Sequence, residues 1–104
     1  MNRNEDTLIG FLIFPGFPMA CLTSMIEPFR AANEIVGRDV FGWKLVSEDG
    51  ARVEASAKVW FEPDLSLDDS DALDQLFLLS GPSTNFANPI ASQAKLRKLA
   101  RHGM

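Results

Sequence analysis

The stretch from Thr7 to Asn33 constrains the fold more than any other part of this 104-residue chain. It opens with a nearly continuous apolar run, TLIGFLIF, which is typical of a β-strand covered on both faces, because a half-exposed strand would alternate apolar and polar residues. Pro15, Gly16 and Pro18 end the run. Apolar side chains then recur at helical spacing, at Leu22, Met25, Ile26, Phe29 and Ala32. A buried strand that leads into a helix is the start of a parallel α/β unit.

The helix in this stretch is expected to run continuously only from about Ser24 to Val36, after a looser turn. Ser24 and Glu27 have the spacing of a capping box, and a proline such as Pro28 is best tolerated near a first helical turn. Gly37 is the expected C-cap.

Further strands and one more helix are predicted downstream. They are a strand over 43–47, a weak strand over 52–57, a short strand over 59–61, a turn or short helix over 65–74, a buried strand over 76–79 and a helix over 89–102. The segments around Asp49-Gly50 could pair as a hairpin that branches from the sheet. Asn88 is the expected N-cap of the last helix, whose buried side is marked by Ile90, Leu96, Leu99 and Ala100.

This order predicts an α/β fold, namely a partial doubly wound, flavodoxin-like parallel sheet with helices on both faces and a small β excursion. The order stops where a further parallel strand would be expected. An incomplete sheet has an open edge, so we expect the chain to self-associate or to belong to a longer gene product.

Composition narrows the function classes. The net charge of −4 argues against a nucleic-acid-binding face, and the basic residues of the last helix are interpreted as a solvated face. One cysteine excludes an internal disulfide, and one cysteine with one histidine is too few for a Cys/His metal site within one chain, so no metal or cofactor is expected. The N-terminus lacks a clear positive charge, and prolines interrupt its apolar run, which favours a cytoplasmic protein without a signal peptide or membrane span.

Two loops are the predicted ligand-binding elements, because ligands of open parallel sheets sit outside the carboxyl ends of the strands. They are 14–17 and 80–83, and they supply the expected ligand-binding residues Pro15, Gly16, Gly81, Pro82 and Ser83. The alternative is that both loops are ordinary strand-to-helix turns. Phe17 and Phe86 follow these loops and could form an aromatic cage for a quaternary ammonium through cation–π attraction. Trp60 and Phe77 are assigned to the core.

Cys21 and Glu27 are two further residues of interest, as possible pocket or interface positions. Cys21 could be a reactive thiol near a helix N-terminus, but its apolar neighbours favour a buried structural cysteine. Glu27 could line the pocket or a dimer contact, although such a residue more often faces water or caps the helix.

Four segments together resemble a known family: FPGFPMACLTSMIEPFRAAN, WKLVSEDG, QLFLLSGP and KLRKLARHG. They are similar to the ThiJ/PfpI-like (GlxA-like, class I glutamine amidotransferase-like) sensor domain of AraC-family transcriptional regulators, and most similar to regulators of quaternary-amine catabolism. The resemblance implies a flexible tail over 1–6 and the front half of a ThiJ/PfpI-like domain over 7–104. It also implies a small amine effector such as betaine or carnitine, self-association, and DNA binding only through a C-terminal domain outside this chain.

The same resemblance argues against catalysis. Enzymes of this fold place a cysteine on a nucleophile elbow, which these residues lack, and Cys21 stands where many relatives carry an acidic residue. No catalytic residue is therefore expected. Two alternatives stay open: a fragment of a PfpI/ThiJ-type hydrolase or glyoxalase, and a dimerisation module that binds no ligand.

Overall fold

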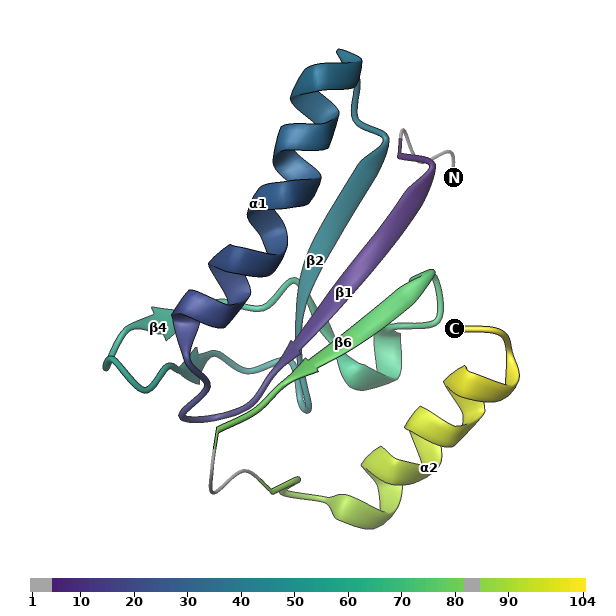
Figure 1. Ribbon diagram of the computed structural model, residues 1–104. Coiled ribbons are helices and arrows are strands. Elements are labelled where there is room, and N and C mark those ends of the chain that lie inside the picture. The colour runs from purple at the N-terminus through teal and green to yellow at the C-terminus, as the bar shows by residue number, and fades with distance from the viewer. Residues whose placement is uncertain (1–4, 82–84) are drawn as a thin grey trace.

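The computed structural model describes residues 5–81 and 85–104 and contains a parallel sheet with one helix on each face (Figure 1). The elements are β1 (Thr7–Ile13), α1 (Met19–Val36), β2 (Phe41–Ser47), β3 (Val53–Glu54), β4 (Trp60–Phe61), β5 (Leu65–Ser66), the 3₁₀ helix η1 (Leu67–Asp69), β6 (Gln75–Leu79) and α2 (Pro89–Arg101). Neither of the described α-helices combines the length and apolar character needed to cross a membrane.

The sheet has the order β5-β2-β1-β6, and every neighbouring pair is parallel. β1 lies in the interior, where Ile9 pairs with Trp43 of β2 on one side and with Gln75 of β6 on the other. The antiparallel pair β3–β4 forms a second, small sheet. The predicted α/β class, with its small β excursion, is therefore confirmed.

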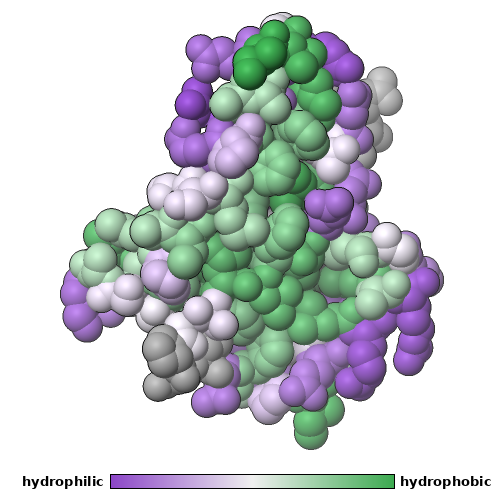
Figure 2. Space-filling view, viewed as in Figure 1, coloured by the Kyte–Doolittle hydropathy of each residue, from purple (hydrophilic) through white to green (hydrophobic). Residues whose placement is uncertain are grey.

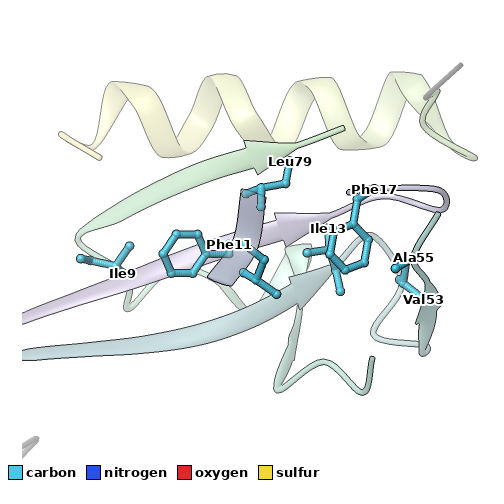
Figure 3. Close-up of a cluster of buried hydrophobic side chains, with 8 residues drawn as sticks. Ile9, Phe11, Ile13, Phe17, Val53, Ala55 and Leu79 are labelled. Carbon is cyan, nitrogen blue, oxygen red and sulfur yellow. The ribbon is translucent and has the colours of Figure 1, made fainter. Parts of the chain in front are cut away.

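Alternation along β1 divides the core into two layers. Ile9, Phe11 and Ile13 pack with Leu22 of α1, in the cluster that Figure 3 shows in part. The opposite face of the strand carries Leu12 and Phe14, which pack with Leu99 of α2. β1 is thus covered by both helices, which explains why its sequence shows no polar alternation.

Helix α1 differs from the prediction in its start. It begins at Met19 and continues through Pro28, rather than beginning near Ser24. Pro28 is exposed, so the carbonyl group that loses its intrahelical donor can be hydrated, and packing of Leu22 holds the first turns in place. Gly37 ends the helix in the left-handed region at φ 85°, as predicted.

At three points around the sheet, a side chain forms hydrogen bonds with main-chain groups that have no strand partner. The Asn33 side chain donates to the Phe41 carbonyl and accepts from the Phe41 N–H, at 2.8 and 2.9 Å. Asp64 accepts from the Leu45 N–H through its carboxylate and donates its own N–H to the Leu45 carbonyl. Asp74 makes the same pair of bonds with Leu8. These bonds satisfy backbone groups that have no strand partner there.

The β excursion also differs from the prediction. β3 and β4 form their hairpin around residues 56–58, where Lys58 adopts φ 67°, and not around Asp49-Gly50. Asp49-Gly50 forms a separate turn in which the Asp49 carboxylate accepts from the Ala51 N–H. The short strand β5, which pairs with the end of β2, was not predicted.

Several side chains assigned to the interior are exposed. β6 was predicted as a buried strand, but it lies at the edge of the sheet, with Phe77 and Leu78 exposed by 37% and 49%. Trp60 is half exposed because it belongs to the excursion. In α2, Ile90 and Ala100 point to solvent, whereas Leu96 and Leu99 face the sheet. Figure 2 shows an apolar surface between the helices, where Figure 1 places β1 and β6.

Candidate ligand-binding site

Two cavities lie at the carboxyl ends of the strands. The first, which we call the charged cavity, has a volume of about 520 Å³ and is formed by the ends of β1 and β2, the start of η1 and the N-terminus of α2. The second, the Phe86 cavity, has a volume of about 500 Å³ and lies between the end of β6 and α2. Phe14 lines both cavities, and its ring meets that of Phe86 edge-on at 5.1 Å.

Glu48 is the central side chain of the charged cavity. It follows β2 directly, and its carboxylate reaches the beginning of α2, where it accepts hydrogen bonds from the N–H groups of Ala87 and Asn88 at 2.7 and 2.8 Å. The Ser92 hydroxyl donates a third bond at 2.7 Å. Glu48 therefore caps α2 in place of Asn88, the predicted N-cap, whose side chain makes no capping bond.

Two opposing effects set the pKa of Glu48. Burial raises the pKa, because it disfavours the charged form, while the bonds from Ser92, Asn88 and Ala87 lower it. The bonds prevail, and the pKa of Glu48 lies below its ordinary value. The positive end of the α2 dipole acts in the same direction. Glu48 is thus an anion at neutral pH that joins the wall of a cavity to a helix.

The Phe86 cavity has a different chemical character. Its described lining consists of apolar groups, amides and one hydroxyl: Phe14, Leu78, Ser80, Gly81, Asn85, Phe86, Pro89 and Gln93. Such a surface can stack on a ligand and hydrogen-bond to it, but its described side chains supply no formal charge.

The predicted ligand-binding residues are divided between several places. Pro15 lines the charged cavity, and Gly81 and Phe86 line the Phe86 cavity. Gly16 adopts φ 83°, which favours glycine, but its N–H already donates to the Glu54 carbonyl at 2.8 Å. Phe17 is fully buried against Phe61, so its ring is a core contact rather than a cavity wall. Pro82 and Ser83 lie outside the described residues.

Cys21 and Glu27 lie on α1 and line neither cavity. Cys21 is exposed, so the expectation of a buried structural cysteine is wrong, whereas the next residue, Leu22, is buried against the sheet. Glu27 is exposed and pairs with Arg30 at 2.7 Å. The last helix also departs from expectation, since Lys95 is largely covered and pairs with Asp71 at 2.8 Å.

Sequence reasoning missed Glu48 as a site residue. The available signal was its position immediately after a predicted strand, in the Ser-Glu-Asp-Gly segment, at the edge where parallel sheets bind ligands. Over 5–81 and 85–104, no three histidine, cysteine or acidic side chains come close enough together to hold a metal ion.

The fold and the two cavities define a parallel α/β domain with ligand-sized pockets at its strand ends. Solved structures share this fold: an AraC family transcriptional regulator from Pseudomonas putida matches with a TM-score of 0.79 and 27% identity, over 94% of this chain and 52% of that chain. Toxoplasma gondii DJ-1 matches with a TM-score of 0.68 and 17% identity over 93% of this chain and 52% of that chain, which shows the fold alone. A DJ-1 superfamily protein from Salmonella typhimurium is a further fold neighbour, with a TM-score of 0.66 and 20% identity over 93% of this chain and 51% of that chain.

Curated relatives agree on the kind of protein. The HTH-type transcriptional regulator GbdR of Pseudomonas aeruginosa is 38% identical over 80 residues, which are 77% of this chain and 22% of that protein. CdhR of the same species is 35% identical over 90% of this chain and 28% of that protein, and GlxA of Rhizobium meliloti is 30% identical over 99% of this chain and 32% of that protein. The chain thus spans about a fifth to a third of these regulators. No family model matches it.

Together, these findings identify the chain as homologous to AraC-type HTH transcriptional regulators and as matching their ThiJ/PfpI-like sensor domain. The resemblance noted from the sequence is thereby confirmed.

Proposed function

We propose that this chain is the front half of the ligand-sensing and dimerisation domain of a cytoplasmic AraC-type regulator that responds to a small amine metabolite, such as betaine or carnitine. DNA would be bound through a C-terminal domain that is not part of these residues. The observation that carries the proposal is the pair of ligand-sized cavities at the strand ends of a chain similar to GbdR and CdhR. The resemblance to regulators of quaternary-amine catabolism suggests the effector class.

In this proposal the two strand-end loops form the binding region. Pro15 and Gly16 lie after β1, and Gly81, Pro82 and Ser83 follow β6, with Phe86 beyond them. Phe86 can offer a ring face to an ammonium group, while Phe17 supports the loop from the core side. Cys21 and Glu27 are exposed on α1, a position suited to a contact between subunits.

The experiment is a thermal-shift panel on the 104-residue chain with betaine, carnitine, arginine and related amines. A ligand present at 100 times its Kd stabilises the folded chain by about 2.7 kcal/mol, which raises the melting temperature measurably. Sodium chloride at matched concentration controls for ionic strength. If no amine shifts the melting temperature, amine sensing by this chain is refuted and a dimerisation module without ligand is the better account.

An enzymatic function is the second candidate, favoured by one observation, the exposed thiol of Cys21. The DJ-1 likeness does not add to it, since identity below 25% shows the fold alone. Glyoxalase or amidase activity that disappears in Cys21→Ser would support this alternative.

A further inference from the structure

The two cavities differ in the charge of their lining residues. Among its described lining residues, the charged cavity carries the carboxylates of Glu48, Asp49 and Asp68 and the guanidinium of Arg52, which leaves a net charge of −2. The described lining of the Phe86 cavity carries no ionisable side chain. An organic cation that enters this end of the sheet therefore meets a favourable potential on one side of Phe14 and a neutral surface on the other.

Arg52, the one cation among the described lining residues of the charged cavity, already contacts an aromatic ring. The guanidinium carbon of Arg52 lies 4.3 Å from the centroid of the Trp60 ring, on the excursion that borders the cavity. This contact holds the guanidinium against an aromatic face. Arg52 is thus positioned beside Trp60 rather than as a dedicated counter-ion of the cavity carboxylates.

The three carboxylates differ in their freedom to contact a ligand. Oε1 of Glu48 accepts from the Ala87 N–H just before α2, and Oε2 accepts from the Asn88 N–H and the Ser92 hydroxyl, so Glu48 contributes negative charge from a fixed position in the wall. One oxygen of Asp49 accepts from the Ala51 N–H. Asp68 is exposed in the first turn of η1 and lines the cavity. Asp68 and Asp49 are therefore the groups best placed for direct contact.

We infer that the charged cavity receives the cationic group of the effector, and that this small organic cation is held by Asp68 and Asp49 in the field of Glu48. The inference rests on the proposed function and adds to it the cavity and the carboxylates. A volume of about 520 Å³ is sufficient for a compact ammonium compound.

The test is calorimetric titration of the 104-residue chain with choline and with its uncharged isostere, in which a tertiary butyl group replaces the trimethylammonium group. Any amine that shifts the melting temperature in the panel is titrated in parallel. We expect the uncharged isostere to bind at least about tenfold more weakly than choline, because two compounds of the same shape differ only in charge. We expect Asp68→Asn to weaken binding of the cation roughly fivefold, since one partly solvated charge is removed.

Two matched variants complete the design. Asp39→Asn removes an exposed carboxylate that does not line the cavity and should leave the affinity unchanged. Gln93→Ala alters the lining of the Phe86 cavity alone and should also leave the affinity unchanged. Equal binding of the isostere, loss of affinity in Gln93→Ala but not in Asp68→Asn, or binding of neither probe would overturn the inference. An amine that still shifts the melting temperature would leave the proposed function standing in each of these cases.

Discussion

Glu48 allows a direct test of how one carboxylate holds a helix. Its folded-state pKa lies below its ordinary value, so its stabilising effect is fully present above the unfolded-state pKa and is lost as the pH falls through the folded-state pKa. We expect Glu48→Gln to lower the free energy of unfolding at pH 7 by about 1 kcal/mol, less than a fully buried charge-assisted hydrogen bond contributes, because the group is partly solvated. Urea unfolding at neutral and acid pH measures this.

The difference between wild type and Glu48→Gln should shrink toward zero in acid, where Glu48 is protonated in both states. Glu62→Gln is the matched control, because Glu62 is exposed on the segment after β4 and should change stability little at any pH. A Glu48→Gln effect that does not change with pH would mean that the charge of Glu48 does not hold α2.

At the level of single residues, the sequence indicated which residues lie at the strand ends, but not which residues they form hydrogen bonds with. Pro15, Gly81 and Phe86 line cavities at the strand ends, where the rule for parallel sheets expects ligands, and their part in ligand binding stays a prediction. Glu48 was missed because its partners just before α2, Ala87 and Asn88, are some 40 residues away in sequence. The exposure of Cys21 depends on which side of a helix meets the sheet, and neighbouring residues on a helix face different ways.

Among the elements, α1 offers a test of a proline inside a continuous helix. Pro28 has no N–H, so one intrahelical bond is absent. We expect Pro28→Ala to raise the free energy of unfolding by about 1–2 kcal/mol, which is the cost of an interior proline reduced by the entropy that proline removes from the unfolded chain. Thermal and urea unfolding measure the change.

Ser24→Ala is the appropriate control for Pro28→Ala, because Ser24 is also exposed on α1 and its replacement changes helix propensity without restoring a backbone donor. If Pro28→Ala stabilises no more than Ser24→Ala, the proline is accommodated without cost. A loss of stability would show that the ring of Pro28 makes a packing contribution.

Elements with long apolar stretches were predicted more accurately than the two-residue strands. β1, β2 and α2 were expected close to their observed bounds, because β1 and β2 contain apolar stretches long enough to identify as strands and Asn88-Pro89 marks the start of α2. β5 and β3 have two residues each, too few to show a period, and they exist through pairing with β2 and β4. The start of α1 was placed five residues late because local proline preference was given more weight than the packing of Leu22.

For the molecule as a whole, the open edge of the sheet is the dominant feature. β6 is the last strand of the described sheet, and the solved regulator from Pseudomonas putida contains about as much chain again as the part matched here. The order of the elements predicted an open edge. It did not predict that the side chains of β6 are exposed, because an apolar run does not reveal whether the strand is covered by neighbouring elements.

We expect the isolated chain to self-associate through this edge, because β6 presents unpaired backbone groups beside the half-exposed side chains of Phe77 and Leu78. Sedimentation velocity over a concentration series should show a dimer or larger species, and Leu78→Lys should shift the distribution toward monomer, since a lysine at a sheet edge opposes strand addition. Val59→Lys is the control, because Val59 is exposed to a similar extent, by 42%, but precedes β4 in the excursion. A monomer at every concentration, or equal effects of the two lysines, would show that this edge is not where copies of the chain meet.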